Sequence, residues 1–228
     1  MTKAQLLGLT KAELINRFDF RCKHGHNGIR HIKCYEKKNH KPIERIGFAD
    51  IETSNLKADF GMVYTWCIKE KGGPLYRGSI TYRDLQSGLL DKNVVGSFVS
   101  CASGFDRLIF HYGENTRFDI PFLRTRAVRW GIEFQKHRDL FVSDTYPILK
   151  NKFKLRSNRL QAACQLFEIK SKGHPLDLHI WAKMQSGNKR MINEALKYIM
   201  SHNIEDVESL EALWEKISPY TQIGRSSI

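Results

Sequence analysis

One stretch of the sequence, residues 47–53 (GFADIET), constrains the fold more than any other. An apolar run typical of a β-strand contains two carboxylates, Asp50 and Glu52, two positions apart. Side chains at this spacing on a strand point to the same face, so both carboxylates should point at one spot. Two acids held together are unfavourable unless a positive charge lies between them. The pattern therefore predicts a divalent cation bound by oxygen ligands, and in a basic protein that indicates phosphate chemistry.

The net charge restricts the partners of this chain. Its 228 residues have a formal net charge of +13, and an excess of this size indicates an extended polyanion as partner. An anionic membrane surface is the competing explanation, but no basic amphipathic helix stands apart from the rest of the sequence. A hydrophobic content of 41% and an aromatic content of 11% argue against disorder. We therefore expect a folded protein that binds nucleic acid.

Other features of the composition indicate a cytoplasmic protein. No apolar run approaches the roughly 20 residues needed to span a bilayer, and the first residues lack the apolar core of a signal peptide. The five cysteines are odd in number and scattered, which does not suggest a disulfide framework. We expect no membrane association and a location in the cytoplasm, which would be the host cytoplasm for a virus-encoded protein.

The sequence divides into an N-terminal module, residues 1–44, and a core domain, residues 45–228. The module begins with an amphipathic helix within residues 1–21 and continues into a basic segment rich in cysteine and histidine. The core begins with three strands joined by short turns and continues with alternating helices and strands, so we expect an α/β fold. The expected strands are Arg45–Glu52, Met62–Glu70, Leu75–Tyr82 and Leu108–Tyr112. The expected helices are Val94–Cys101, Ile120–Trp130 and Arg159–Phe167, followed by the last helices, which run through Asn193–Lys216.

A third carboxylate, Asp119, follows the fourth expected strand and opens a helix. Pro121 suits the first turn of that helix. Asp119 could simply cap the helix N-terminus, which is the commonest role of such a residue. The same helix contains Arg124 and Arg126, which we expect to hold phosphates near this carboxylate.

His202 and Asp206 lie four residues apart near the C-terminus and would share one face of a helix. They could form an ordinary pair on a solvated helix surface. However, Asp206 lies between Ile204 and Val207 and should face the core side, where a carboxylate without a ligand is unfavourable.

Together, the segments DIET, RFDIPFL and HNIEDVESL resemble the three exonuclease motifs of the DEDD superfamily of 3′→5′ exonucleases. The resemblance is to the exonuclease domain of family-B DNA polymerases and spans residues 45–216. It implies a ribonuclease H-like fold, with a mixed sheet of an antiparallel meander plus parallel strands, flanked by helices. It also implies two Mg²⁺ or Mn²⁺ ions, bound by Asp50, Glu52, Asp119 and Asp206.

The resemblance assigns His202 as the general base, but with a departure from the family pattern. One class of these enzymes has a tyrosine four residues before the last aspartate, and another has a histidine five residues before it. This chain has a histidine at the tyrosine spacing. An imidazole with an ordinary pKa near 6.5 can accept a proton from water, whereas a tyrosine would mainly orient the water. Two metal ions would activate that water and stabilise the leaving 3′ oxygen.

The N-terminal module contains a second group of potential metal ligands. Two thiolates and two imidazoles could form a tetrahedral Zn²⁺ site, although five candidates compete for four places. The alternative is a basic loop that contacts phosphates without a metal. If zinc is bound, its role is structural, because so polar a segment has little else to fold around. The candidates are Cys22, His24, His26, His31 and Cys34.

Two further groups of residues are expected to contact nucleic acid. The basic segment around Lys152, Lys154 and Arg156 could follow the phosphate backbone, and a merely solvated loop is the alternative. Phe60, which follows the first acidic motif, could line the 3′-terminal nucleotide or simply belong to the core.

The leading functional hypothesis is a metal-dependent 3′→5′ exonuclease that acts on DNA or RNA with a 3′ end. The compact size and basic charge favour a stand-alone, virus-encoded enzyme. A structure-specific or RNA-directed nuclease on the same fold is the nearest alternative. A catalytically silent nucleic-acid-binding module would have lost some of the carboxylates, and none is missing. A zinc-finger-type regulator would leave the core motifs unexplained.

Overall fold

The computed structural model describes residues 11–39, 44–112, 118–136, 139–171 and 177–221. The chain forms two compact units, residues 1–44 and residues 45–228. The first unit contains helices α2 (Lys11–Asp19) and α3 (Ile32–Asn39). The predicted N-terminal helix is confirmed over Lys11–Asp19, and its first ten residues lie outside the described part. Helix α3 was not predicted.

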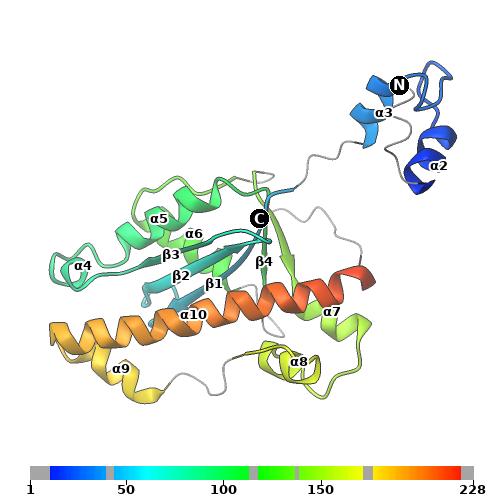
Figure 1. Cartoon of the computed structure of the whole chain (residues 1–228). Coiled ribbons are helices and arrows are strands. Elements are labelled where there is room, and N and C mark those ends of the chain that lie inside the picture. The colour runs from blue at the N-terminus through cyan, green and yellow to red at the C-terminus, as the bar shows by residue number, and fades with distance from the viewer. Residues whose placement is uncertain (1–10, 40–43, 113–117, 137–138, 172–176, 222–228) are drawn as a thin grey trace. The chain divides into compact units, whose positions relative to one another are not determined.

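The second unit is built on a five-stranded mixed sheet with the strand order β3-β2-β1-β4-β5 (Figure 1). Strand β2 pairs antiparallel with both β1 and β3, whereas β4 pairs parallel with both β1 and β5. This arrangement confirms the predicted α/β fold with an antiparallel meander plus parallel strands. The strands are β1 (Ile46–Thr53), β2 (Val63–Glu70), β3 (Leu75–Ser79), β4 (Arg107–Phe110) and β5 (Phe141–Asp144).

Helices cover both faces of this sheet (Figure 1). The longest, α10, replaces the predicted C-terminal helices with one 29-residue helix. No helix among the described residues is long and apolar enough to cross a membrane. The helices of this unit are α4 (Tyr82–Gln86), α5 (Lys92–Ala102), α6 (Asp119–Arg129), α7 (Thr145–Lys152), α8 (Leu160–Leu166), α9 (Leu178–Gln185) and α10 (Lys189–Ile217), followed by the short 3₁₀ helix Ser218–Tyr220.

Strand β3 ends earlier than predicted because the chain enters helix α4. The predicted strand continued to Tyr82, but Thr81 caps the helix and Tyr82 is its first residue. The Thr81 hydroxyl accepts from the backbone N–H of Asp84, and the Asp84 carboxylate accepts from the backbone N–H of Thr81. This reciprocal capping satisfies backbone groups that would otherwise lack partners. Its sequence signal, a threonine three residues before an acid, competes with the apolar strand pattern.

The two faces of β1 have different surroundings. Phe48 packs in a cluster with Ile109 of β4 and with Val207 and Trp214 of α10. Ala49 and Ile51, which point to the opposite face, belong to the larger core cluster, together with Phe98 of α5 and Leu123 of α6. Because side chains alternate along a strand, Asp50 and Glu52 share the face of Phe48. The carboxylates therefore lie on the side of the sheet that α10 covers.

A buried ion pair joins three elements on the other side of the sheet. Asp91 is completely buried, and its carboxylate accepts from the Arg126 side chain at 2.6 and 2.7 Å. It also accepts from the indole of Trp130 at 2.8 Å and from the backbone N–H of Val63 at 3.0 Å. Arg126 donates in addition to the backbone carbonyl of Ala58. Arg126 therefore stabilises the fold.

This placement shows that the prediction of Arg126 as a phosphate contact was wrong. Its side chain is 4% exposed and is fully engaged by Asp91. The sequence could not show this, because Asp91 lies 35 residues away and its pairing with Arg126 depends on how α5 and α6 pack.

We predict that Arg126→Met lowers the free energy of unfolding of this unit by about 3–5 kcal/mol, because it leaves the Asp91 carboxylate buried without its cation. The measurement is urea unfolding followed by tryptophan fluorescence. All four tryptophans lie within residues 45–228, so the signal reports this unit alone. Arg129→Met, at an exposed position on the same helix, is the control and should change stability little. An equal, small effect of both substitutions would contradict the prediction.

Candidate active site

Three carboxylates converge between β1 and α10. Asp50 and Glu52 come from β1, and Asp206 comes from α10 far along the chain. Each offers a carboxylate oxygen, and these oxygens all lie within 4.8 Å of one another. All three residues are only partly buried, so the group can be reached from solvent. Three negative charges this close repel one another, and a bound divalent cation would relieve that repulsion.

Asn203 holds Asp50 in this arrangement. Its side-chain amide donates to Asp50 Oδ2 at 2.7 Å, and the residue is completely buried. Asn203 lies on α10 one turn before Asp206. Helix α10 therefore supplies both the Asp206 carboxylate and the Asn203 amide, which orients Asp50 on β1. The sequence analysis missed Asn203; its position next to His202 in the HNIED segment was the available signal.

Asp119 approaches the same strand from helix α6. It is the first residue of that helix, and the preceding Phe118 occupies the N-cap position. The Asp119 carboxylate accepts from the backbone N–H of Ile51, which lies between the two acidic residues of β1, at 3.2 Å. Asp119 is not one of the three residues whose oxygens cluster within 4.8 Å. It nevertheless contacts the strand that holds two of them, so its role extends beyond its own helix.

Burial raises the pKa of Asp119 to about 7, although hydrogen bonds from its own backbone and from Ile51 oppose the shift. The nearby carboxylates of Glu52 and Asp144 raise this pKa further. A buried acid surrounded by other acids is costly to ionise, and a cation at the site would reverse that preference.

A cavity of about 210 Å³, which we call the carboxylate pocket, opens beside these acids. Its polar lining includes Asp50, Asp206, His111, Gln161 and Ser171. Both a strand acid and a helix acid therefore face one space. The remaining lining residues are Leu160 and Leu210.

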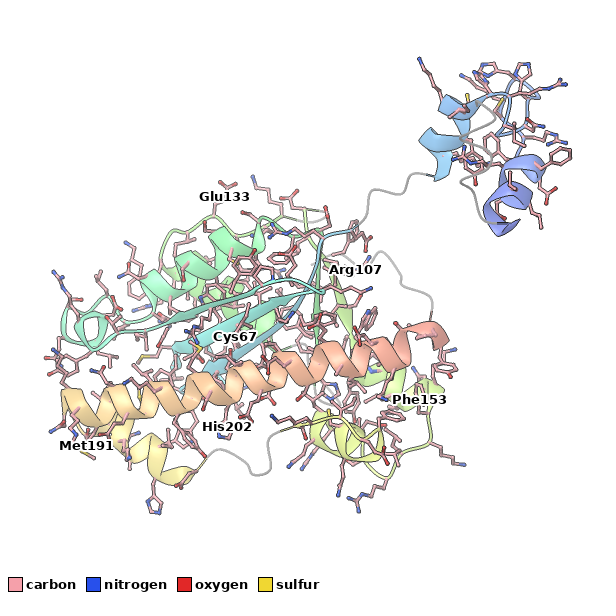
Figure 2. All side chains as sticks on the ribbon, viewed as in Figure 1. Cys67, Arg107, Glu133, Phe153, Met191 and His202 are labelled. Atoms are coloured by element: carbon pink, nitrogen blue, oxygen red, sulfur yellow. The ribbon has the colours of Figure 1, made fainter. Side chains whose placement is uncertain are left out.

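His202 lies on α10 (Figure 2). The residue is only 3% exposed. The ring packs against Tyr198, with centroids 4.5 Å apart. His202 does not line the carboxylate pocket, although it lies one helical turn from Asp206, which does. Its role as a general base therefore stays a prediction.

His111 does line the carboxylate pocket and was missed by the sequence analysis. Its Nδ1 lies 2.8 Å from the hydroxyl of Thr145. Burial lowers the pKa of His111 to about 4, against an opposing hydrogen bond with the backbone of Asn158, so the ring is neutral at pH 7. The strand pairing explains its place: Phe48 pairs with Ile109, and Asp50 and His111 each follow two residues later, His111 just beyond the end of β4.

A second cavity, which we call the basic groove, adjoins the carboxylate pocket and shares Gln161 and Ser171 with it. It has a volume of about 620 Å³, and its cationic lining residues are Arg156, Arg159 and Lys170. Of the predicted contacts, Arg156 therefore lines this groove. Lys152 and Lys154 precede Arg156 in the chain and are exposed, but they do not line the groove.

The remaining predicted contacts lie around the start of α6. Arg124 is half-buried, with its guanidinium 5.7 Å from the ring centroid of Phe134. Phe60 is 84% exposed, so it does not belong to the core. Leu56, four residues earlier, is 79% exposed and lines a cavity of about 400 Å³ together with Phe118. Two large apolar side chains thus lie in solvent on the loop that follows the acidic strand.

In the N-terminal unit, four of the five predicted zinc ligands lie together. The ligand atoms of Cys22, His24, His31 and Cys34 are within 4.8 Å of one another, and His26 is not part of this group. Partial burial raises the pKa of the Cys22 thiol, but hydrogen bonds with His31 and His24 outweigh it and lower the pKa to about 5. The thiolate, which is the metal-binding form, is therefore favoured at neutral pH.

Comparisons with known proteins identify the family. The family model of the RNase_H superfamily matches residues 47–218, which include all four predicted carboxylates. The chain belongs to the RNase_H superfamily. This membership agrees with the mixed sheet flanked by helices and with the convergence of acids on the central strand.

A solved structure shares this fold. The family B DNA polymerase from the hyperthermophilic archaeon Pyrobaculum calidifontis superposes with a TM-score of 0.61 at 19% sequence identity. The match covers 78% of this chain and 25% of the polymerase, so the chain spans about a quarter of the length of that relative. At this identity the likeness establishes the fold alone. No curated protein matches the sequence.

We predict that Asn203→Ala weakens the affinity of the carboxylates for Mn²⁺ by about 10–100-fold, because Asp50 loses the hydrogen bond that orients it. The measurement is calorimetric titration of the full chain with Mn²⁺. Ser201→Ala removes an exposed hydroxyl on the same helix and is the control. An unchanged Mn²⁺ affinity in Asn203→Ala, with the fold intact by circular dichroism, would show that Asn203 does not position Asp50.

Proposed function

We propose that the chain is a metal-dependent 3′→5′ exonuclease that hydrolyses phosphodiester bonds of DNA or RNA. The observation that supports this most directly is the convergence of Asp50, Glu52 and Asp206 oxygens within 4.8 Å. Membership of the RNase_H superfamily and the fold shared with a family B DNA polymerase agree with the proposal. We place the catalytic function in residues 45–228 and treat residues 1–44 as a separate module.

The residues at the site fit a hard divalent cation. Asp50, Glu52 and Asp206 present only carboxylate oxygens, the ligand type that Mg²⁺ and Mn²⁺ prefer. Asp119, beside Ile51, completes the four carboxylates proposed to hold two ions. When bound, such ions make a water molecule nucleophilic near neutral pH and stabilise charge on the leaving oxygen.

The chain's own groups have separable tasks in this proposal. Asn203 orients Asp50, so that the strand acid keeps one conformation before a metal binds. His202 is the proposed proton acceptor, one helical turn from Asp206. His111 is neutral at pH 7 and faces the pocket, where an uncharged imidazole can hydrogen-bond to a phosphate or a water molecule.

The basic groove supplies a path for the phosphate backbone. It shares two lining residues with the carboxylate pocket, so a strand bound along it would lead to the acids. Arg156 belongs to the groove, and Lys152 and Lys154 add positive charge on the segment before it. Exposed Phe60 is proposed to stack against a base at the 3′ end, since aromatic rings stack on bases without regard to sequence. Arg124 is proposed to reach phosphate only if it leaves Phe134.

We predict that the purified chain with Mg²⁺ or Mn²⁺ shortens 5′-labelled oligonucleotides from the 3′ end, giving a ladder of products. DNA and RNA substrates, each single-stranded and duplex, are compared side by side. Asp50→Asn is the matched control; it should remove the activity while leaving binding of the same oligonucleotide largely unchanged, because only a metal ligand is lost.

The product pattern separates the alternatives. Clean internal cuts would replace the exonuclease proposal with a structure-specific nuclease. Binding without hydrolysis, at any of the metals tested, would leave a silent nucleic-acid-binding module. Hydrolysis by Asp50→Asn at the wild-type rate would show that the carboxylates are not the site.

We predict that the double variant Arg156→Ala/Arg159→Ala weakens binding of single-stranded nucleic acid and flattens its salt dependence. Each lost phosphate contact should reduce the slope of log K against log salt by about 0.7. Binding is measured by fluorescence anisotropy in the Asp50→Asn background, so that the substrate is not degraded. Lys92→Ala removes an exposed cation from α5, which packs on the other face of the sheet, and is the control. Equal slopes for the two variants would exclude the basic groove as the binding path.

A further inference from the structure

The Cys/His group in residues 22–34 has the dimensions of a tetrahedral zinc site. Cys22 Sγ lies 3.8 Å from His24 Nδ1 and 3.4 Å from His31 Nδ1, and Cys34 Sγ lies 3.9 Å from His24 Nδ1. Zinc bonds of about 2.3 Å to sulfur and about 2.0 Å to nitrogen, at a tetrahedral angle, place the two ligand atoms about 3.5 Å apart. The observed separations lie on either side of that value.

The four side chains come from two local backbone elements, a turn and the start of a helix. Cys22 and His24 lie on a tight turn, in which the N–H of Gly25 donates to the carbonyl of Cys22 at 2.8 Å. Gly25 has a φ of +79°, a conformation that favours glycine. His31 immediately precedes α3 and Cys34 lies in its first turn, where the N–H of Cys34 donates to the carbonyl of His31. A turn and a helix start thus bring together two pairs of ligands.

The unit otherwise has little to hold it together. None of the hydrophobic side chains whose burial is described for residues 14–39 is buried, and Ile15 and Phe18 are more than half exposed. The main apolar contact is an edge-on pair of Phe20 and Tyr35, with Arg17 stacked on Tyr35. Ordering the backbone costs about 1–2 kcal/mol per residue. Without a buried core, a cross-link is needed to offset that cost.

We propose that Cys22, His24, His31 and Cys34 bind one structural Zn²⁺, through both thiolates and through Nδ1 of both histidines. Sulfur and imidazole ligands select zinc over the Mg²⁺ or Mn²⁺ expected at the carboxylates. Four protein ligands close the site, so the ion holds the turn against α3. His26 is not a ligand, because it does not belong to the group whose ligand atoms lie within 4.8 Å of one another. The proposal is independent of the nuclease function.

The test is the zinc content of the full chain, purified without added metal and measured by mass spectrometry. An Asp50→Asn/Asp206→Asn background prevents the carboxylates from contributing bound zinc. The expected content is about one equivalent per chain in this background. Adding His26→Ala should leave it unchanged, whereas adding His24→Ala or Cys34→Ala should reduce it at least several-fold. Cys101→Ala, in the other unit, is the matched control for cysteine loss.

A second measurement separates loss of the ligand from general misfolding. Tryptophan fluorescence reports only residues 45–228, so unchanged unfolding of that unit in Cys34→Ala would confine the effect to the N-terminal unit. Replacement of zinc by Co²⁺ should give the intense visible absorption of a tetrahedral thiolate site, lost in Cys34→Ala and kept in His26→Ala. Less than a tenth of an equivalent of zinc in the parent protein would overturn the proposal. Equal zinc loss in His24→Ala and His26→Ala would overturn this choice of ligands.

Discussion

The alternation of side chains along β1 is the constraint on which the unit of residues 45–228 depends. Phe48 anchors α10 to the sheet through Val207 and Trp214, and the same face of the same strand then presents Asp50 and Glu52. The same face of β1 therefore packs against α10 and carries the two acidic residues, and α10 contacts both. Its apolar residues bury Phe48, and its polar residues Asn203 and Asp206 meet the acids. A shift of β1 by one residue would turn Phe48 and both carboxylates toward the opposite face of the sheet and bring Ala49 and Ile51 to the face of α10.

Two buried aspartates of residues 45–228, Asp91 and Asp119, lie in contrasting electrostatic surroundings. Asp91 is completely buried, but the guanidinium of Arg126, an indole and a backbone N–H satisfy its carboxylate. Asp119 is almost as buried and accepts from Ile51, and its pKa is raised by burial and by neighbouring acids. The first acid is neutralised within the protein and stabilises the fold. The second has Glu52 and Asp144 as acidic neighbours, and a bound cation would relieve their repulsion.

Different interactions offset the entropy cost of ordering the chain in the two units. Residues 45–228 bury a large apolar core on both faces of a sheet, and this core positions the acids. The N-terminal unit has no buried hydrophobic side chain among its described residues and instead gathers thiol and imidazole groups. Each unit thus has its own cluster of potential metal ligands, one of hard oxygen atoms and one of sulfur and nitrogen atoms. Their chemistry favours different ions, so both can be filled in one chain.

The sequence by itself determined the features that depend on local periodicity. Alternation placed Asp50 and Glu52 on one face, apolar runs predicted the meander and β4, and the spacing of cysteine and histidine predicted a compact ligand group. Helical spacing predicted that His202 and Asp206 share one face of a helix. These patterns repeat over a few residues, so neighbouring positions in the chain are sufficient to reveal them.

Only the tertiary structure decided which distant groups meet. It paired Arg126 with Asp91, which removed Arg126 from the predicted phosphate contacts. It placed Asn203 on Asp50 and brought His111, rather than His202, to the pocket wall. It also separated His26 from the other four zinc candidates. Each outcome depends on the packing of elements far apart in sequence, and side-chain spacing along one element carries no information about that packing.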